Sequence, residues 1–207
     1  MNKRVLLAAV WLGLSATAYS ADAQSAAQTI TAQTALGNAE RAGLLLMREE
    51  EKLAHDVYQA LYSRWQQPIF DNISRSEARH MAAMGRLLQR YGIADPQQPA
   101  AGRFSDPALQ KLYHELVERG SRSRSDALQV GALVEELDIA DLNRLSAQTQ
   151  QADILQVYAQ LNRGSRNHLR SFDRQLRQAG ASYQPQHLSG EAYRAIVESG
   201  MERGRQR

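Results

Sequence analysis

Ser76-Glu77-Ala78-Arg79-His80-Met81 is the most informative stretch of this 207-residue chain. Glu77 and His80 lie on one helical stripe with apolar residues on either side, namely Ile73, Met84 and Leu87. Residues three apart project from the same side of a helix, so both side chains can face one metal ion. Burying them without a partner is costly. The pattern therefore predicts either a metal ion or an ion pair with another helix.

The segments on either side of this stretch predict a helical hairpin. Apolar residues at helical spacing indicate a first helix over 42–65. A second helix is expected to begin at Asp71 or Asn72, as its cap, and to end near Tyr91. The connection over 66–70 is short, so the two helices should be antiparallel neighbours.

The second half of the chain predicts another hairpin. A long connection over 92–125 contains the helix start Ser105-Asp106-Pro107, for a small helix that stops at Gly120. A third helix is expected over 126–145 and a fourth over 152–179. Two hairpins joined by a long crossover have the ferritin-like topology of the four-helix bundle. We therefore predict an all-α fold of this kind, without strands.

The start of the chain predicts export. Asn2-Lys3-Arg4 is basic, the next ten residues are apolar, and small residues follow, as in a signal peptide. The mature protein should then be periplasmic or secreted, with no membrane segment. The predicted organisation is a signal peptide over 1–23, a flexible lead-in over 24–39, the helical domain over 40–188, and a short helix with a basic tail over 189–207.

The amino-acid composition limits which partners and which metal ligands the chain can have. The 25 basic and 22 acidic residues are interspersed along the chain, so a nucleic-acid partner is not expected. The chain has no cysteine, which excludes thiolate ligands and thiol nucleophiles. Any metal must be held by carboxylates and imidazoles. Such ligands favour iron, manganese or zinc over copper(I) or an iron-sulfur cluster.

Each predicted long helix carries an acid or a histidine near its middle, on its inward stripe. One glutamate of the run Glu49-Glu50-Glu51 is expected to turn inward, although such a run commonly forms a solvated face. Gly164 interrupts the fourth helix and predicts close packing or a local bulge. The predicted metal ligands are Glu51, Glu77, His80, Glu135 and His168, with Glu50, Glu136 and Asp138 as further candidates.

The sequence also resembles a known family. Glu51 and Tyr58, followed by Glu77-x-x-His80, resemble the first half of the ferritin and rubrerythrin metal site. More closely, several segments are similar to those of an uncharacterised ferritin-like domain family of bacteria and archaea, over residues 40–188. These segments are 49–54, 70–73, 76–81, 131–139 and 164–170.

The resemblance implies a ferritin-like fold and metal ligation by Glu51, Glu77, His80 and Glu135, and it aligns His168 with the histidine of the last helix. The family's activity is not established. Ser165 departs from the pattern, because a glutamate is expected there. Asp138, one turn after Glu135, can replace the lost charge; otherwise the site holds one ion or a weakly bound pair.

Two functions remain open at this point. The first is an exported protein that binds one or two iron or manganese ions, with oxidase or peroxidase activity as its extension, that is, a metal-dependent oxidoreductase. The second is a metal-free helical interaction or structural module of the cell envelope. In the second, Glu77 and His80 would be paired with Arg79, Arg166 or Arg170. Both leave the oligomeric state open, an oligomer included.

Overall fold

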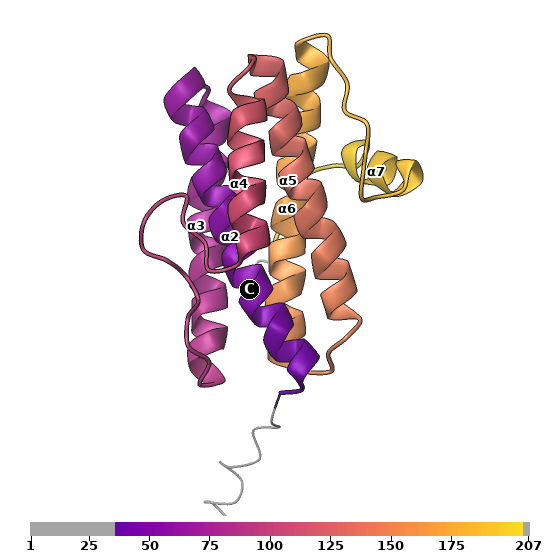
Figure 1. The fold of residues 1–207 in the computed structure, drawn as a ribbon. Coiled ribbons are helices and arrows are strands. Elements are labelled where there is room, and N and C mark those ends of the chain that lie inside the picture. The colour runs from indigo at the N-terminus through magenta and orange to yellow at the C-terminus, as the bar shows by residue number, and fades with distance from the viewer. Residues whose placement is uncertain (1–35, 205–207) are drawn as a thin grey trace, which may run out of the picture. The chain divides into compact units, whose positions relative to one another are not determined.

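The computed structural model describes residues 36–204, and over these residues the chain is all-helical, with six helices and no strand (Figure 1). The predicted signal peptide and most of the predicted lead-in lie outside the described residues. The helices are α2 (Asn38–Trp65), α3 (Pro68–Arg90), α4 (Pro107–Gly120), α5 (Arg124–Ser146), α6 (Ala152–Gln178) and α7 (Gly190–Val197).

The four long helices pack as two antiparallel pairs. Helix α2 lies along α3, α5 lies along α6, and the pairs meet where α2 contacts α5 and α3 contacts α6 (Figure 1). Only Gln66 and Gln67 separate α2 from α3, and Gln66 adopts a left-handed conformation with φ 53°. The predicted cap at Asp71 or Asn72 was wrong. Helix α3 begins earlier because Pro68 has a fixed φ and needs no amide partner at the first helical position.

The crossover between the pairs is fastened to α2 by charged side chains. Asp106 caps α4 as expected, accepting the amide of Ala108 at 2.7 Å. Glu49 accepts the amide of Ser105 at 2.6 Å, and Lys52 donates to the carbonyl of Ala100 at 3.0 Å. Glu49 and Lys52 therefore hold the crossover against α2.

Apolar residues form two clusters along the four long helices. One contains Tyr58 and Phe172, and the other contains Met47 and Leu161. On each long helix one buried polar residue falls between residues of the two clusters, namely Glu51, Glu77, Glu135 and Ser165. The fold thus creates a polar layer near the middle of four helices.

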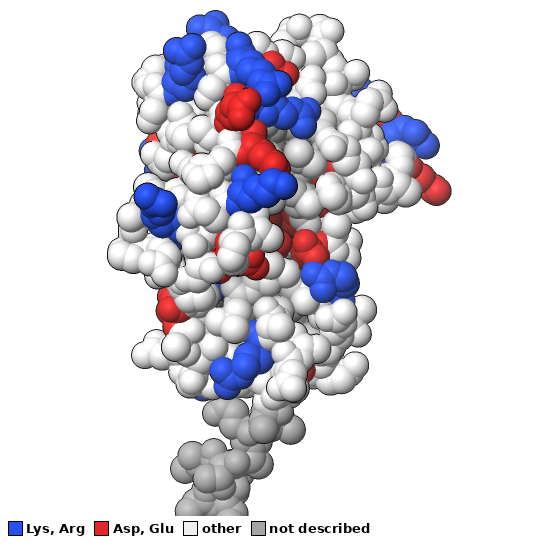
Figure 2. Space-filling view, in the orientation of Figure 1, with Lys and Arg blue, Asp and Glu red and all other residues white. Residues whose placement is uncertain are grey.

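The surface mixes both signs of charge, and basic and acidic side chains are interspersed over the face shown in Figure 2. Helix α7 packs on α6 and begins at Ser189, which accepts the amide of Ala192 at 3.1 Å. Within residues 36–204, no helix is long and apolar enough to cross a membrane.

Candidate metal centre

Glu77 lies at the centre of the polar layer. Its side chain is fully buried, and its two oxygens face two different histidines. Oε2 lies 2.6 Å from Nδ1 of His80, one turn later on α3, and Oε1 lies 2.8 Å from Nδ1 of His168 on α6. The imidazole rings are stacked, with centroids 5.9 Å apart. One carboxylate therefore lies between two imidazoles.

Two further glutamates complete two triads. Glu51 Oε2 lies 3.2 Å from Nδ1 of His80, and Glu135 Oε2 lies 3.3 Å from Nδ1 of His168. Within each triad, Glu51–Glu77–His80 and Glu77–Glu135–His168, the candidate ligand atoms lie within 4.8 Å of one another. The structure thus brings together all five residues predicted as principal ligands.

The donor atoms in this layer fit a cation. Both oxygens of Glu77, Oε1 of Glu51, Oε2 of Glu135 and Nδ1 of His168 are buried without a hydrogen-bond partner among the described residues. Buried polar atoms nearly always have such a partner. The close contacts between Glu77 and the histidines therefore lack hydrogen-bond geometry, and the unused lone pairs match the needs of a metal ion.

Burial and neighbouring charges shift the pKa values of the groups in this layer. Burial raises the pKa of Glu51 to about 7, against the opposing effect of His80. Burial also raises the pKa of Glu77, but His168 and His80 reverse this and leave it below the usual value. Burial lowers the pKa of His168, whereas Glu77 and Glu135 raise it, to about 10. The imidazoles therefore hold protons that a metal ion would have to displace.

The further candidates divide into two groups. Asp138 and Glu50 are buried beside the triads, and Asp138 Oδ2 and Glu50 Oε2 have no hydrogen-bond partner in the described chain. Glu136 points elsewhere, which corrects its place among the candidates. It accepts the amides of Gln186, His187 and Leu188 at 2.7 to 2.8 Å. Glu136 therefore holds the segment after α6 in place through these hydrogen bonds.

The fourth helix lacks its expected carboxylate. Ser165 is buried and, among residues 36–204, donates only to the carbonyl of Leu161, at 3.2 Å. The predicted close packing at Gly164 involves His80: a Cβ at residue 164 would lie 2.6 Å from Cε1 of that ring. Helix α6 runs through Gly164 as α-helix, without a bulge.

Tyr58, which the resemblance placed with Glu51 in the first half of a metal site, contacts the second triad. Its hydroxyl donates to Oε1 of Glu135 at 2.6 Å, and its ring packs against Phe172 with centroids 5.5 Å apart. Its position seven residues after Glu51, two turns along the same helix face, was the available signal. Tyr58 therefore orients a carboxylate of the second triad.

The arginines proposed as partners of Glu77 and His80 do not reach them. Arg166 and Arg170 bind Glu202, at 2.5 and 2.8 Å, and Arg79 is exposed. Two other histidines make local contacts. Nδ1 of His55 lies 2.8 Å from Oδ1 of Asp56, and Nε2 of His114 lies 3.3 Å from Nε2 of Gln110.

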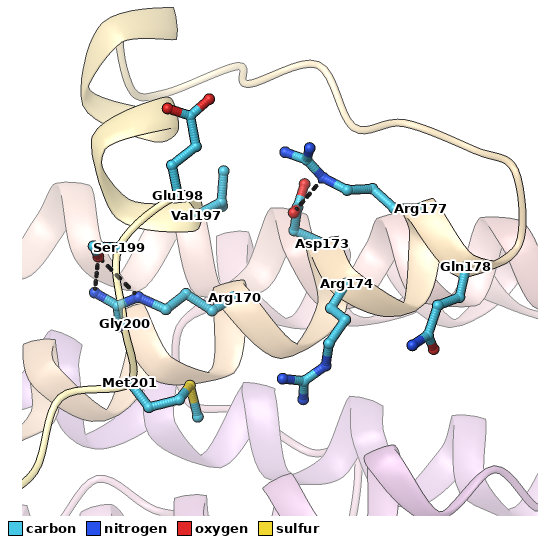
Figure 3. Close-up of a pocket in the computed structure, with 10 residues that line it drawn as sticks. All are labelled: Arg170, Asp173, Arg174, Arg177, Gln178, Val197, Glu198, Ser199, Gly200 and Met201. Atoms are coloured by element: carbon cyan, nitrogen blue, oxygen red, sulfur yellow. Dashed lines mark hydrogen bonds and ion pairs between the residues drawn. The ribbon is translucent and has the colours of Figure 1, made fainter.

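A cavity of about 720 Å³ lies between α6 and the end of α7 (Figure 3). Its charged lining is largely paired internally, since Arg177 binds Asp173 at 2.7 Å and Arg170 binds Ser199 at 2.8 Å. None of the five principal candidate ligands lines it.

Comparisons with known proteins give a family without an assigned activity. Residues 40–200 match the family described as Uncharacterized protein domain (DUF2202). The chain is 50% identical over 169 residues to the uncharacterized protein MJ0754 of Methanocaldococcus jannaschii, covering 81% of this chain and 91% of the relative. It is also similar to the crystal structure of hypothetical protein MJ0754 from Methanococcus jannaschii, with a TM-score of 0.80 and 48% identity over 81% of this chain and 96% of the other. The chain therefore belongs to the DUF2202 family. This confirms the expectation that it is a member of an uncharacterised family.

Proposed function

We propose that this chain is an exported ferritin-like four-helix bundle protein that binds two iron or manganese ions through Glu51, Glu77, His80, Glu135 and His168. The observation that carries this proposal is Glu77. It is fully buried, offers one oxygen to each of two triads, and has no hydrogen-bond partner for either oxygen in the described chain. Such a carboxylate is suited to bridging two ions in a helical core.

Charge supports a pair of divalent ions. Glu51, Glu77 and Glu135 contribute three negative charges, and Asp138 contributes a fourth beside them. Four buried carboxylates balance two divalent cations, whereas uncompensated buried charge is expensive. The mixture of carboxylate and imidazole favours iron or manganese over softer metals.

Bound iron or manganese would supply redox chemistry toward oxygen or peroxide, as in an oxidase or a peroxidase. The side chains then have distinct roles. Tyr58 fixes the orientation of Glu135 through its hydrogen bond. The apolar clusters above and below the layer exclude water. Ser165 leaves the α6 side of the layer with His168 as its nitrogen donor and without a carboxylate.

The second candidate is a metal-free structural or interaction module of the cell envelope. It is favoured by the raised pKa of both histidines: burial lowers them, but Glu51 reverses this for His80, and Glu77 and Glu135 do so for His168. Two imidazolium ions would satisfy Glu77 without a metal.

Metal analysis separates the two functions. The protein is prepared without a histidine tag, loaded anaerobically with Fe²⁺ or Mn²⁺, desalted, and measured by elemental analysis. We expect about two ions per chain from the two triads. Glu77→Gln keeps the size of the side chain but removes the shared charge, so it should lose both ions.

Glu118→Gln is the matched control, because Glu118 is an exposed residue of α4 that pairs only with Arg122 among the described residues. Its metal content should equal that of the wild type. Wild-type protein that retains no ion after loading would overturn the metal function in favour of the envelope module. If ions are retained, consumption of oxygen or peroxide by the Fe²⁺ form tests the oxidoreductase activity.

A further inference from the structure

The two histidines are the only part of the two triads that reaches the surface. The side chains of Glu51, Glu77 and Glu135 are 0% exposed, whereas those of His80 and His168 are each 13% exposed. Nδ1 of both rings faces the buried glutamates. A molecule that approaches the triads from solvent therefore meets the outer edges of the two rings first.

These edges lie between α3 and α6. Gly164 of α6 packs against Cε1 and Nε2 of His80, and the rings of His80 and His168 stack across the helix pair. Helix α4 packs on α2 and α5, on the opposite side of the bundle (Figure 1). Within residues 36–204, no further helix packs on both α3 and α6. The histidine edges are therefore on the side of the bundle that α4 leaves uncovered.

A groove with two hollows follows this helix pair. One hollow, of about 430 Å³, is lined by residues within 67–73 and 171–175. The other, of about 220 Å³, is lined by residues within 83–90 and 153–160. We call these two linings the α3–α6 groove. On both helices the histidine pair and Gly164 lie between the two hollows, so the ring edges are near the middle of the groove.

The α3–α6 groove is basic. Arg86 lines the smaller hollow and Arg174 the larger one, and neither pairs with an acid among the described residues. The only acid in either lining is Asp153, which accepts from Arg90 at 2.8 Å and from Tyr91 at 2.7 Å. A cleft lined by unpaired positive charge concentrates anions and speeds their association.

We propose that small anions reach the two triads through the α3–α6 groove, beside the exposed edges of His80 and His168, and that Arg86 and Arg174 attract them. This rests on the proposed function, because the ions held by the triads are what the anion reaches. Each triad supplies three residues, which leaves open positions on an iron ion. A small inorganic anion is thus the class of outside ligand that the groove favours.

Azide is the probe, because it is a small anion that gives a visible charge-transfer absorption on Fe³⁺. The iron-loaded protein is oxidised chemically and mixed with azide in a stopped-flow spectrometer, at low and at high salt. Arg86→Gln/Arg174→Gln should bind azide about tenfold more slowly than the wild type at low salt, since a charged cleft changes association rates by this order or more. It should also lose most of the salt dependence.

Arg41→Gln/Arg103→Gln is the matched control, because it removes the same charge from exposed residues of α2 and the crossover. It should bind azide at the wild-type rate. A reduced rate in both double variants would show that net charge, and not the groove, attracts the anion, and would overturn the role of the two arginines.

Ala83→Trp tests the path itself. A side chain on a helix leans toward the N-terminus, so a large side chain at residue 83 covers the turn that carries His80. The variant should keep two ions and bind azide more slowly, by as much as the arginine variant or more. Ala82→Trp is the matched control, because Ala82 is exposed and lies outside both linings. It should bind azide like the wild type.

Iron content is measured first in every variant, which separates this inference from the proposed function. Wild-type protein that retains no iron would overturn the metal site and the route to it together. Two ions per chain with no azide binding, or with equal azide rates in the wild type, Arg86→Gln/Arg174→Gln and Ala83→Trp, would overturn the route alone.

Discussion

His80 keeps its position against α6 because residue 164 has no side chain. A Cβ there would lie 2.6 Å from Cε1 and 2.7 Å from Nε2 of the ring. The ring is thereby directed with Nδ1 toward Glu77 and Glu51. The glycine thus sets the direction of a candidate nitrogen ligand.

Gly164→Ala should weaken metal binding while the protein still folds. The imidazole can rotate away from the new methyl group, and alanine is favoured over glycine in a helix by about 1 kcal/mol. Loss of a group that orients a ligand typically lowers metal affinity by about 10- to 100-fold. Mn²⁺ titration and thermal unfolding of the metal-free protein measure the two effects.

Gly85→Ala is the matched control on α3, where the nearest atom, Nε of Arg48, lies 3.9 Å from the added Cβ. It should change neither metal affinity nor the fold. Equal Mn²⁺ affinity in the two alanine variants would contradict the positioning role of Gly164.

Three successive glutamates on α2 have different surroundings. Glu49 binds the crossover, Glu50 is buried with Oε2 unbonded among the described residues, and Glu51 completes the first triad. The sequence indicated that one of them turns inward. It could not indicate that all three are buried, because the partner of Glu49 is Ser105, 56 residues later in the chain.

At the scale of elements, the segment after α7 is tied to α6. Arg166 donates to Glu202 from Nε at 2.7 Å and from Nη2 at 2.5 Å, and Arg170 donates at 2.8 Å. Both arginines lie within two residues of His168. The tie therefore holds the part of α6 that carries a candidate ligand.

This tie should depend on pH. The hydrogen bonds from Arg166, opposed by burial and supported by Arg170, lower the pKa of Glu202 to about 2, below its ordinary value of 4.5. A pKa that is lower in the folded state stabilises the fold above the unfolded-state pKa. The stabilisation is lost as pH falls through the folded-state value.

The measurement is urea unfolding of the metal-free wild type and Glu202→Gln across this range. The difference in the free energy of unfolding should be present near neutral pH and should shrink as pH approaches 2. A difference that stays constant down to acid pH would show that the carboxylate charge does not hold the tie.

Helix starts were predictable at polar capping residues. Asp106, followed by Pro107, caps α4 as expected, and Ser189 caps the short helix that was expected over 189–207. The start of α3 was misplaced because Asp71 is a good capping residue in isolation. It lies instead in the first turn of a helix that Pro68 has already begun.

At the scale of the whole molecule, the polar layer interrupts the apolar interior. The clusters on either side of it are well packed, but the layer gathers Glu51, Glu77, Glu135 and Asp138 without enough hydrogen bonds. A ligand that binds only the folded chain would offset this cost by mass action.

Metal should therefore raise the melting temperature. Each ion present at 100 times its Kd adds about 2.7 kcal/mol of stability, which corresponds to a rise in Tm of about 5 to 10 °C in a chain of this size. Anaerobic thermal unfolding with and without Mn²⁺ measures the shift. Glu77→Gln should show none, and an equal shift in both proteins would place the stabilising ions elsewhere.

Much of the architecture could be predicted from periodicity, because each long helix has its own apolar stripe. The convergence of Glu77, His80 and His168 was likewise indicated by inward positions on neighbouring helices. The direction of Glu136 was not, since its partners are the amides of 186–188, beyond the end of α6. Periodicity predicts on which face of a helix a residue lies. It does not predict which faces are covered by a loop that comes later in the chain.

The two triads are unequal in how much of the chain they require. The first triad consists only of residues from α2 and α3, namely Glu51, Glu77 and His80. The second triad combines Glu135 of α5 and His168 of α6 with Glu77 of α3. A growing chain that has formed only its first hairpin already contains one complete set of donors. The second set of donors is complete only when the second hairpin docks on the first. Glu77 therefore makes the second triad depend on contact between the two hairpins.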